Sequence, residues 1–303
     1  MFENIPQSKT WARVEQVDKG FSMDQKYHIW DADGAEYLLR ISPIGLYESK
    51  QQIFELLGQL AKQGIPASRP VAIGTLNSEQ MYLLLTWLQG TDAEKYLKSA
   101  DEDTAYMLGV QGGKILKRMQ TLEVPERKES WTVAYQRMVE KRIQETENCP
   151  YALPKTELLA KYIREHRHLV QDRPAVFMHG DYHVGNMIVD QDGNLGIIDF
   201  DRAKIADPYR EFKCFQWNVL ASPHFASGLI DGYFDGEIPA DFFPILALFA
   251  AEGLVHYINW SAPYGEAELA LAIDNYKKQL QWFDDFQRVV PTWYVGKGLR
   301  DFR

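Results

Sequence analysis

Short apolar runs separated by turn-forming residues fill the first part of the chain, from residue 14 to about residue 85. One turn signal is the DADG segment at residues 31–34, and residues 37–41 (YLLRI) form the apolar run after it. Residues 47–63 differ, because their apolar positions recur three and four apart and share one helical face. The pattern predicts a strand-rich region that contains a helix.

The pattern changes to helical periodicity at about residue 92. Long amphipathic stretches follow around residues 104–119, 133–146 and 157–167. A strand-rich half followed by a helical half is typical of an α+β fold. We therefore predict a bilobal α+β protein, with a small β-rich lobe over residues 1–88 and a larger helical lobe over residues 89–303.

The most apolar stretch, residues 242–258, includes Pro244, Glu252 and His256. It falls short of the ~20 apolar residues that a membrane span requires, so we expect a buried helix. A signal peptide has a basic region followed by an apolar core, and the N-terminal segment has neither in that order. We expect a cytoplasmic protein without membrane association.

Acidic residues outnumber basic ones by 42 to 33, which gives a net charge of −9. This charge repels polyanions and attracts cations, so we expect no nucleic-acid partner. Cys149 and Cys214 lack the paired spacing of a zinc site and suit a reducing compartment. The oligomeric state stays open between a monomer and a homodimer.

Residues 176–200 carry the densest group of candidate functional residues. Two strand-like runs, 187–189 and 195–198, flank a DQDGN turn and predict a β-hairpin. Asn186 directly precedes the first run and Asp199 directly follows the second, so we expect both at the same end of the hairpin. An amide oxygen and a carboxylate are hard ligands that suit Mg²⁺.

Asp181 lies on the preceding loop, five positions before Asn186. In phosphoryl transfer, an aspartate on such a loop orients the attacking hydroxyl and accepts its proton, while metal ions bridge the phosphates. Together with His179 and Asp199, these residues match that arrangement in order and spacing. His179 is a candidate catalytic residue, for which bracing of the loop by hydrogen bonds is favoured over direct chemistry.

The motif HGDYHVGN at residues 179–186, followed by IIDFD at residues 197–201, resembles the paired signature of the aminoglycoside phosphotransferase superfamily. That superfamily includes choline, fructosamine and homoserine kinases. The resemblance implies a protein-kinase-like fold, Asp181 as the catalytic base, and Asn186 and Asp199 as magnesium ligands. It implies a small-molecule kinase that moves the γ-phosphoryl of ATP or GTP onto a hydroxyl. In looser form it extends from about residue 14 to the C-terminus.

Two other functions fit parts of the sequence. His179 and His183 could ligate zinc in a metal-dependent hydrolase, although no further His or Cys lies nearby at ligand spacing. A nucleotide-binding pseudokinase or regulatory module is the second alternative. It is motivated by two departures from the family in the first lobe: Arg40 in place of lysine, and no acid at position 53.

The phosphate-binding half matches the family only in part. Arg40 stands where the family usually has lysine. Arginine keeps the positive charge of lysine, but its planar head group binds phosphate differently from the point charge of lysine. An outward-facing surface arginine is the alternative reading of this position. The family's acidic partner is expected at about Ile53, which leaves Glu48 and Glu55 as candidates, and we favour Glu48.

Other nucleotide contacts are predicted on two segments. Residues 20–24 (GFSMD) could form the phosphate loop with Ser22 as an added donor, although a single glycine is more often only a turn. Residues 85–90 (LTWLQG) resemble the family's hinge, whose backbone binds the purine. Trp87 and Leu88 are therefore candidate adenine contacts.

The helical half combines acidic and aromatic residues, and such groups together bind ammonium ions. We therefore expect a small-molecule hydroxyl substrate that is cationic. Trp217 and Trp260 fall in helical apolar patterns, which favours a place for them in the core. The acidic and aromatic residues concerned are Asp231, Asp235, Glu237, Glu252, Glu266, Glu268, Trp217, Tyr257, Trp260 and Tyr264.

Overall fold

The computed structural model describes residues 2–18, 24–124 and 129–296. The chain divides into two compact units, the first made of residues 1–93 and 186–203 and the second of residues 94–185 and 204–303. The predicted α+β class is confirmed. The predicted division at residue 88 differs from this arrangement, because the hairpin after the candidate catalytic loop belongs to the first unit.

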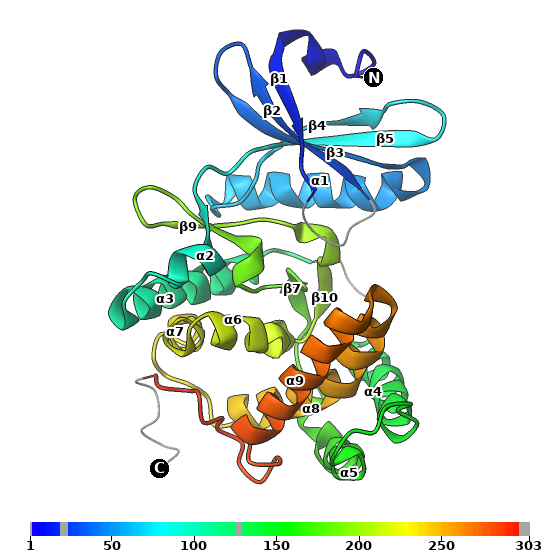
Figure 1. The fold of residues 1–303 in the computed structure, drawn as a ribbon, viewed down its shortest axis with the longest axis vertical. Helices are drawn as coiled ribbons and strands as arrows, with labels where there is room; N and C mark the ends of the chain where they lie inside the picture. Colours follow the sequence, from blue (N-terminus) through cyan, green and yellow to red (C-terminus); the bar gives the residue numbers. More distant parts are fainter. Residues whose placement is uncertain (1, 19–23, 125–128, 297–303) are drawn as a thin grey trace. The chain divides into compact units, whose positions relative to one another are not determined.

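An antiparallel five-stranded sheet and one long helix make up most of the first unit (Figure 1). The strand order is β1-β2-β3-β5-β4, and α1 (Tyr47–Lys62) packs against β4 and β5. The strands are β1 (Trp11–Gln16), β2 (Gln25–Asp31), β3 (Glu36–Pro43), β4 (Pro70–Thr75) and β5 (Gln80–Thr86).

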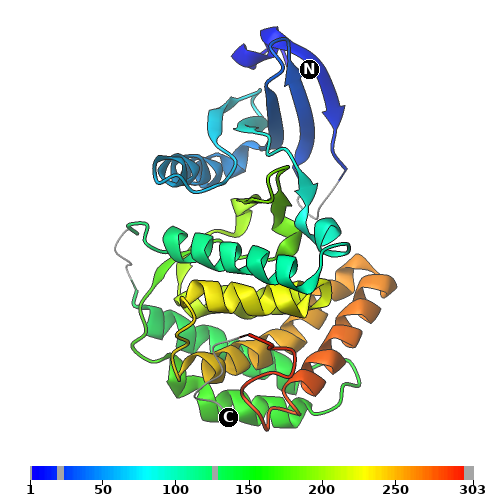
Figure 2. The same cartoon turned by 90° about the vertical axis from the view of Figure 1, so that its left-hand side faces the viewer.

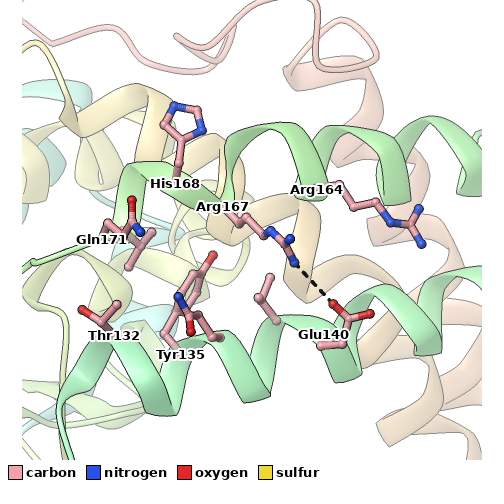
Figure 3. A pocket seen from close by; sticks show the side chains of 10 residues that line it. Thr132, Tyr135, Glu140, Arg164, Arg167, His168 and Gln171 are labelled. Carbon is pink, nitrogen blue, oxygen red and sulfur yellow. Dashed lines mark hydrogen bonds and ion pairs between the residues drawn. The ribbon is translucent and has the colours of Figure 1, made fainter.

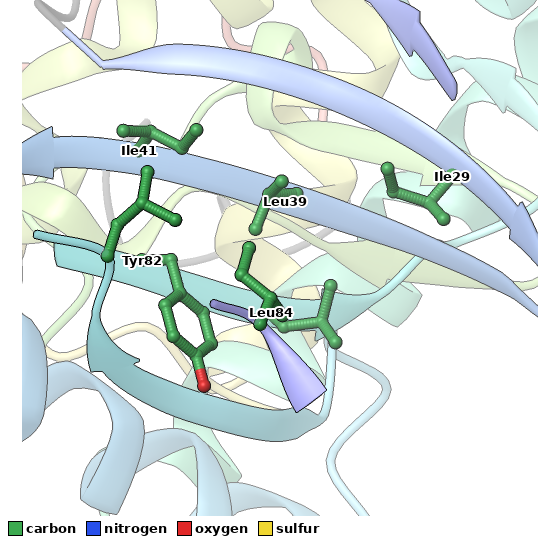
Figure 4. Close-up of a cluster of buried hydrophobic side chains, with 7 residues drawn as sticks. Ile29, Leu39, Ile41, Tyr82 and Leu84 are labelled. Atoms are coloured by element: carbon green, nitrogen blue, oxygen red, sulfur yellow. The ribbon is translucent and has the colours of Figure 1, made fainter. Parts of the chain in front are cut away.

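The two faces of the five-stranded sheet have different environments. On one face, Leu39 and Ile41 of β3 pack with Ile29, Tyr82 and Leu84 in a buried apolar cluster (Figure 4). Side chains alternate along a strand, so the residues between these point to the opposite face.

A second sheet of the first unit holds the predicted hairpin. Its strands are β6 (Thr91–Asp92), β8 (Met187–Val189) and β9 (Leu195–Ile197), in the order β6-β8-β9. The turn between β8 and β9 forms because Asp190 Oδ1 accepts the backbone N–H of Asp192 and of Asn194. The predicted hairpin is confirmed.

Helices dominate the second unit. Several begin at side-chain caps, such as Asp101 Oδ1, which accepts the Thr104 N–H at 2.7 Å. The helices are α2 (Ala93–Leu97), α3 (Glu102–Met119), α4 (Trp131–Glu147), α5 (Thr156–His166), α6 (Phe215–Ala221), α7 (Pro223–Tyr233), α8 (Phe242–Ser261) and α9 (Glu266–Trp282). A short ladder joins β7 (Val176–Met178) to β10 (Lys204–Ala206).

Helix α8 is the apolar stretch that the sequence predicts to be buried. Residues 242–264 are long and apolar enough to span a membrane by length and composition, so the expectation that they fall short was too strict. However, 72% of the most apolar window is buried inside the protein, as in the core helix of a water-soluble unit. The predicted buried helix is confirmed.

Helices α3 and α7 lie side by side (Figure 2), and four glycines allow their close approach. A Cβ atom at Gly109 would lie 2.1 Å from the carbonyl oxygen of Phe225, and one at Gly232 would lie 2.3 Å from that of Val110. Gly113 and Gly228 make equivalent approaches. The two backbones therefore touch where any side chain would separate them.

We predict that Gly232→Ala lowers the free energy of unfolding by about 1–3 kcal/mol, because the added methyl group must push two backbones apart. Gly253→Ala on α8 is the matched control, since its Cβ would meet nothing within 4 Å outside the local backbone of its own helix. That variant should gain up to about 1 kcal/mol from helix propensity. Chemical denaturation of both variants measures the difference, and equal effects would contradict the close packing.

Candidate functional site

The candidate catalytic loop, residues 179–185, is held by hydrogen bonds within the second unit. His179 is fully buried, and its Nδ1 accepts the backbone N–H of Asp181 at 3.2 Å. The ring therefore braces the loop beside Asp181. The Tyr182 hydroxyl donates to the Gly112 carbonyl of α3 at 2.7 Å, and the Val184 N–H donates to Asn218 Oδ1 of α6 at 2.9 Å.

Glu211 supplies another anchor for this loop. It lies in a 3₁₀ segment, Pro208–Cys214, and its Oε1 accepts the Gly180 N–H at 2.8 Å. The carboxyl is 1% exposed and its Oε2 is a buried oxygen without a hydrogen-bond partner. Burial raises the pKa of Glu211 to about 7, against the lowering effect of the Lys213 charge.

Asp181 itself has a half-buried carboxylate. His183 Nε2 lies 3.6 Å from its Oδ1, and Cys214 Sγ lies 3.8 Å from the same oxygen. With a side-chain exposure of 22%, the carboxylate stays accessible to a small molecule. This is the environment that a proton acceptor needs.

The hairpin brings Asn186 and Asp199 to one end, as predicted. The Ile198 N–H donates to the Asn186 carbonyl at 3.0 Å, directly beside Asp199. Asp199 has φ 63° and ψ 70°, a left-handed conformation that is uncommon for a residue other than glycine. Its side chain is 37% exposed. The two residues offer amide and carboxylate oxygens, the donor types that fit Mg²⁺.

Arg40 is 3% exposed, so the alternative of an outward-facing surface arginine is wrong. Its position on β3 faces away from the apolar cluster and toward three carboxylates. Nε donates to Asp24 Oδ2 at 2.8 Å, Nη1 lies 3.4 Å from Asp199 Oδ1, and Nη2 pairs with Asp201. Arg40 thus reaches the carboxylate that is expected to bind metal.

The acidic partner of Arg40 is Asp24 and not Glu48. Glu48 is exposed on the first turn of α1, and Glu55 is exposed further along this helix, where it accepts a hydrogen bond from Gln51. The acids that pair with Arg40 instead come from the residue before β2 and from the segment after β9. Helix α1 contributes a cation to this cluster, Lys50.

Mutual charge neutralisation holds the cluster. Burial alone would raise the pKa of Asp24, but the charges of Arg40 and Lys50 outweigh burial and hold that pKa below its usual range. Conversely, burial would lower the pKa of Arg40, and the carboxylates of Asp201, Asp199 and Asp24 raise it. Across the β2–β3 ladder, burial and the Arg40 charge lower the pKa of Lys26.

Three of the residues missed by the sequence analysis left a signal. Lys50 shares a helical face with Ile53 and Leu57, so it is a charged residue on an apolar stripe. Asp201 stands two positions after Asp199 in the IIDFD motif. Glu211 lies in the segment DPYREF at residues 207–212, which also resembles members of the family. Asp24 ends the GFSMD segment (residues 20–24), a candidate phosphate loop, but nothing in the sequence marked it as the partner of Arg40.

The remaining nucleotide candidates have mixed outcomes. Ser22 lies outside the described residues. The Trp87 N–H donates to the Glu36 carbonyl at 2.9 Å and its ring stacks on His28 at 3.6 Å, so that amide is not available to a purine. Leu88 is half-buried and packs on Gly196 of β9, and its role in purine binding stays a prediction.

The acidic residues considered for substrate binding divide by environment. Asp231 is buried and accepts hydrogen bonds from Tyr106 and Tyr294, while Glu252 is buried between Arg210 and Tyr135. These two support the fold of the second unit and do not face a ligand. The other acids considered are Asp235, Glu237, Glu266 and Glu268, which are exposed or half-buried.

Aromatic rings form a series in the second unit that begins at the catalytic loop. The ring centroids of His183 and Trp217 of α6 lie 6.3 Å apart, and those of Trp217 and Tyr257 of α8 lie 5.7 Å apart. Tyr257 stacks on Trp260 at 5.8 Å, and Trp260 lies 4.8 Å from Tyr264. All five rings are half-buried or exposed, so the expectation that Trp217 and Trp260 are core residues is wrong.

A pocket of about 550 Å³ lies elsewhere in the second unit (Figure 3). It is lined by α4, the end of α5 and the following 3₁₀ turn (Arg167–Val170), where Arg167 Nη1 lies 3.3 Å from Glu140 Oε2. None of the candidate site residues lines it. Its arginines are paired with glutamates, so we assign it no part in the chemistry.

The zinc alternative finds no support in the geometry. Within residues 2–18, 24–124 and 129–296, no group of three or more His, Cys, Asp or Glu side chains is arranged to hold a metal ion. The Nδ1 atoms of His179 and His183 each accept a backbone N–H from the loop. Asp207 caps the 3₁₀ segment Pro208–Cys214 by accepting the Tyr209 N–H at 2.8 Å.

Comparison with solved structures shows the same fold in several kinases. An amicoumacin kinase in complex with AMP-PNP and Ca²⁺ superimposes with a TM-score of 0.66 at 16% identity, over 91% of this chain and 90% of that one. The GDP complex of an aminoglycoside 2'-phosphotransferase-IIIa gives a TM-score of 0.67 at 15% identity, over 92% of this chain and 96% of that one. The predicted protein-kinase-like fold is confirmed.

Sequence comparison gives the family. An aminoglycoside 3'-phosphotransferase of Niallia circulans is 27% identical over 201 residues, which cover 63% of this chain and 73% of that relative. Residues 13–243 match the model of the phosphotransferase enzyme family. The resemblance noted in the two motifs is confirmed. The chain therefore belongs to the phosphotransferase enzyme family and is a kinase-like enzyme that uses an alcohol group as acceptor.

Proposed function

We propose that this protein transfers the γ-phosphoryl group of Mg²⁺-bound ATP or GTP to a hydroxyl of a small cationic molecule. The observation that carries the proposal is the contact of Arg40 with Asp199, because it joins a phosphate-binding cation to a candidate metal ligand in one unit. Relatives whose structures contain AMP-PNP or GDP support a nucleotide donor.

Each side chain has a defined task in this scheme. Asn186 and Asp199 would hold Mg²⁺, which neutralises phosphate charge when it is bound. Arg40 binds the phosphate oxygens, since a guanidinium pairs with them through two parallel hydrogen bonds. Asp181 accepts the proton of the attacking hydroxyl. His179 and Glu211 position the Asp181 loop through the Asp181 and Gly180 amides.

The acceptor is proposed to lie along the aromatic series that starts at His183. Aromatic faces attract ammonium groups. Burial is the main cause of the raised pKa of the Tyr257 hydroxyl; a hydrogen bond with Ser261 lowers this pKa, and the Glu268 charge raises it by a smaller amount. The net charge of −9 favours approach of a cation. An amine-bearing hydroxyl compound fits these features, as an aminoglycoside or an amino alcohol would.

Asp181→Asn should lower kcat for phosphoryl transfer by about 10²–10⁴-fold, the usual contribution of a general base. The Kd for the nucleotide should stay within about twofold, because a neutral isostere changes only the proton acceptor. Asp192→Asn, in the exposed hairpin turn, is the control and should leave kcat unchanged. Transfer from labelled ATP and GTP to a panel of hydroxyl compounds provides the assay.

Two results would redirect this assignment. Nucleotide binding without transfer to any acceptor of the panel would favour the regulatory-module alternative. Full activity of Asp181→Asn would remove Asp181 from the proposed role.

Trp217→Leu should raise KM for the cationic acceptor by about 3- to 30-fold, the range that corresponds to loss of a cation–π contact. KM for the nucleotide should not change, and Trp217→Phe should recover most of the affinity because it keeps an aromatic face. Steady-state kinetics with each substrate varied in turn separates the two constants. Equal KM values for the leucine and phenylalanine variants would argue against the aromatic surface.

Glu211→Gln should flatten the dependence of stability on pH. The folded pKa of about 7 lies above the ordinary value of 4.5, so the unfolded state loses its proton first and wild-type stability falls as pH rises between these values. The amide keeps an oxygen for the Gly180 N–H without a titrating proton. As the pH rises from 4.5 to 8, the free energy of unfolding of the variant should increase relative to that of wild type by up to about 3 kcal/mol. Chemical denaturation at several pH values measures this difference. If the free energies of unfolding of the two proteins change with pH in the same way, Glu211 does not titrate with a raised pKa.

A further inference from the structure

Lys50 is a buried cation on the helix where the family resemblance implied the acidic partner of Arg40. It lies in the first turn of α1, is 5% exposed, and occupies the apolar stripe of the helix. Its Nζ donates to Asp24 Oδ2 at 2.7 Å and to Asp201 Oδ1 at 3.0 Å. An ammonium is retained in such a place only where carboxylates compensate for lost hydration.

Arg40 uses the same two carboxylates. It shares Asp24 Oδ2 with Lys50 and pairs with the other oxygen of Asp201. Ser42 fixes the orientation of Asp24 by donating to Oδ1 at 2.7 Å. The two cations are therefore held next to each other by one shared pair of aspartates.

The cluster is closed at one end and open at the other. The side-chain exposure rises from 3% at Asp24 to 24% at Asp201 and 37% at Asp199. Buried charges of this kind add little stability compared with apolar packing, whereas they recur at functional sites. The open end is the end that carries the candidate metal ligand.

We infer that Lys50 is a second phosphate-binding side chain that acts beside Arg40, and that Asp24 is the acid that positions both cations. This inference rests on the function proposed above. Asp24 stays with the cations, while phosphate oxygens replace Asp201 on Lys50 and Arg40 when the nucleotide binds. Helix α1 thus supplies a second cation beside Arg40, and the residue before β2 supplies the acid that the family resemblance placed on the helix.

Lys50→Met tests the inference through nucleotide binding in the absence of acceptor. Calorimetry with MgATP and MgGTP should show a 10- to 100-fold higher Kd, since a charge-assisted hydrogen bond to phosphate is lost. Adenosine, measured by competition, should bind within twofold of wild type because it has no phosphate. Lys50→Arg keeps the charge and should stay within about fivefold of wild type, a range that allows for its different head group.

Lys62→Met is the matched control, an exposed lysine in the last turn of the same helix, and it should not alter any Kd. Lys50→Gln keeps a hydrogen-bond donor for both aspartates and repeats the measurement if the methionine variant fails to fold. An unchanged Kd for triphosphates in a folded variant would overturn the phosphate-binding role of Lys50 and leave the proposed function untouched. An equal loss for adenosine and triphosphates would mean that Lys50 is only structural. Wild-type protein that binds neither triphosphate would overturn the proposed function together with this inference.

Discussion

The burial of the Arg40 guanidinium is the constraint on which the first unit depends. A permanently charged group with 3% exposure loses most of its hydration, and only opposite charges at close range can compensate for that loss. Three aspartates provide this compensation from different parts of the chain. As a result, the start of β2, the centre of β3 and the segment after β9 must lie together for the sheet to be stable.

The same constraint links stability with chemistry. Asp199 sits in a left-handed conformation after β9, at the end of a hairpin whose register also fixes Asn186. A cation that holds Asp199 in this position also marks where phosphates are proposed to bind. The charges that the fold must neutralise are thus the charges that a metal–nucleotide complex would use.

The second unit solves a different problem, that of holding an accessible carboxylate on a rigid loop. The loop around Asp181 is tied to three helical segments by the Glu211 carboxyl, the Asn218 amide and the Tyr182 hydroxyl. The first two bonds satisfy the backbone N–H groups of Gly180 and Val184, and the third ties the Tyr182 side chain to a carbonyl of α3. One of those segments is α3, whose Gly112 carbonyl accepts the hydrogen bond from the Tyr182 hydroxyl. The glycine contacts hold α3 against α7.

The sequence by itself determined the class of fold, the hairpin and the order of Asp181, Asn186 and Asp199. These features depend on local patterns, since strand alternation, helical periodicity and turn chemistry act over a few residues. Only the tertiary structure decided which acid pairs with Arg40, because Asp24 and Asp201 approach it from 16 and 161 positions away. The burial of Lys50 and Glu211 likewise depends on contacts between distant segments. The apolar stripe places Lys50 on the buried face of α1, but it does not show which carboxylates compensate for its charge.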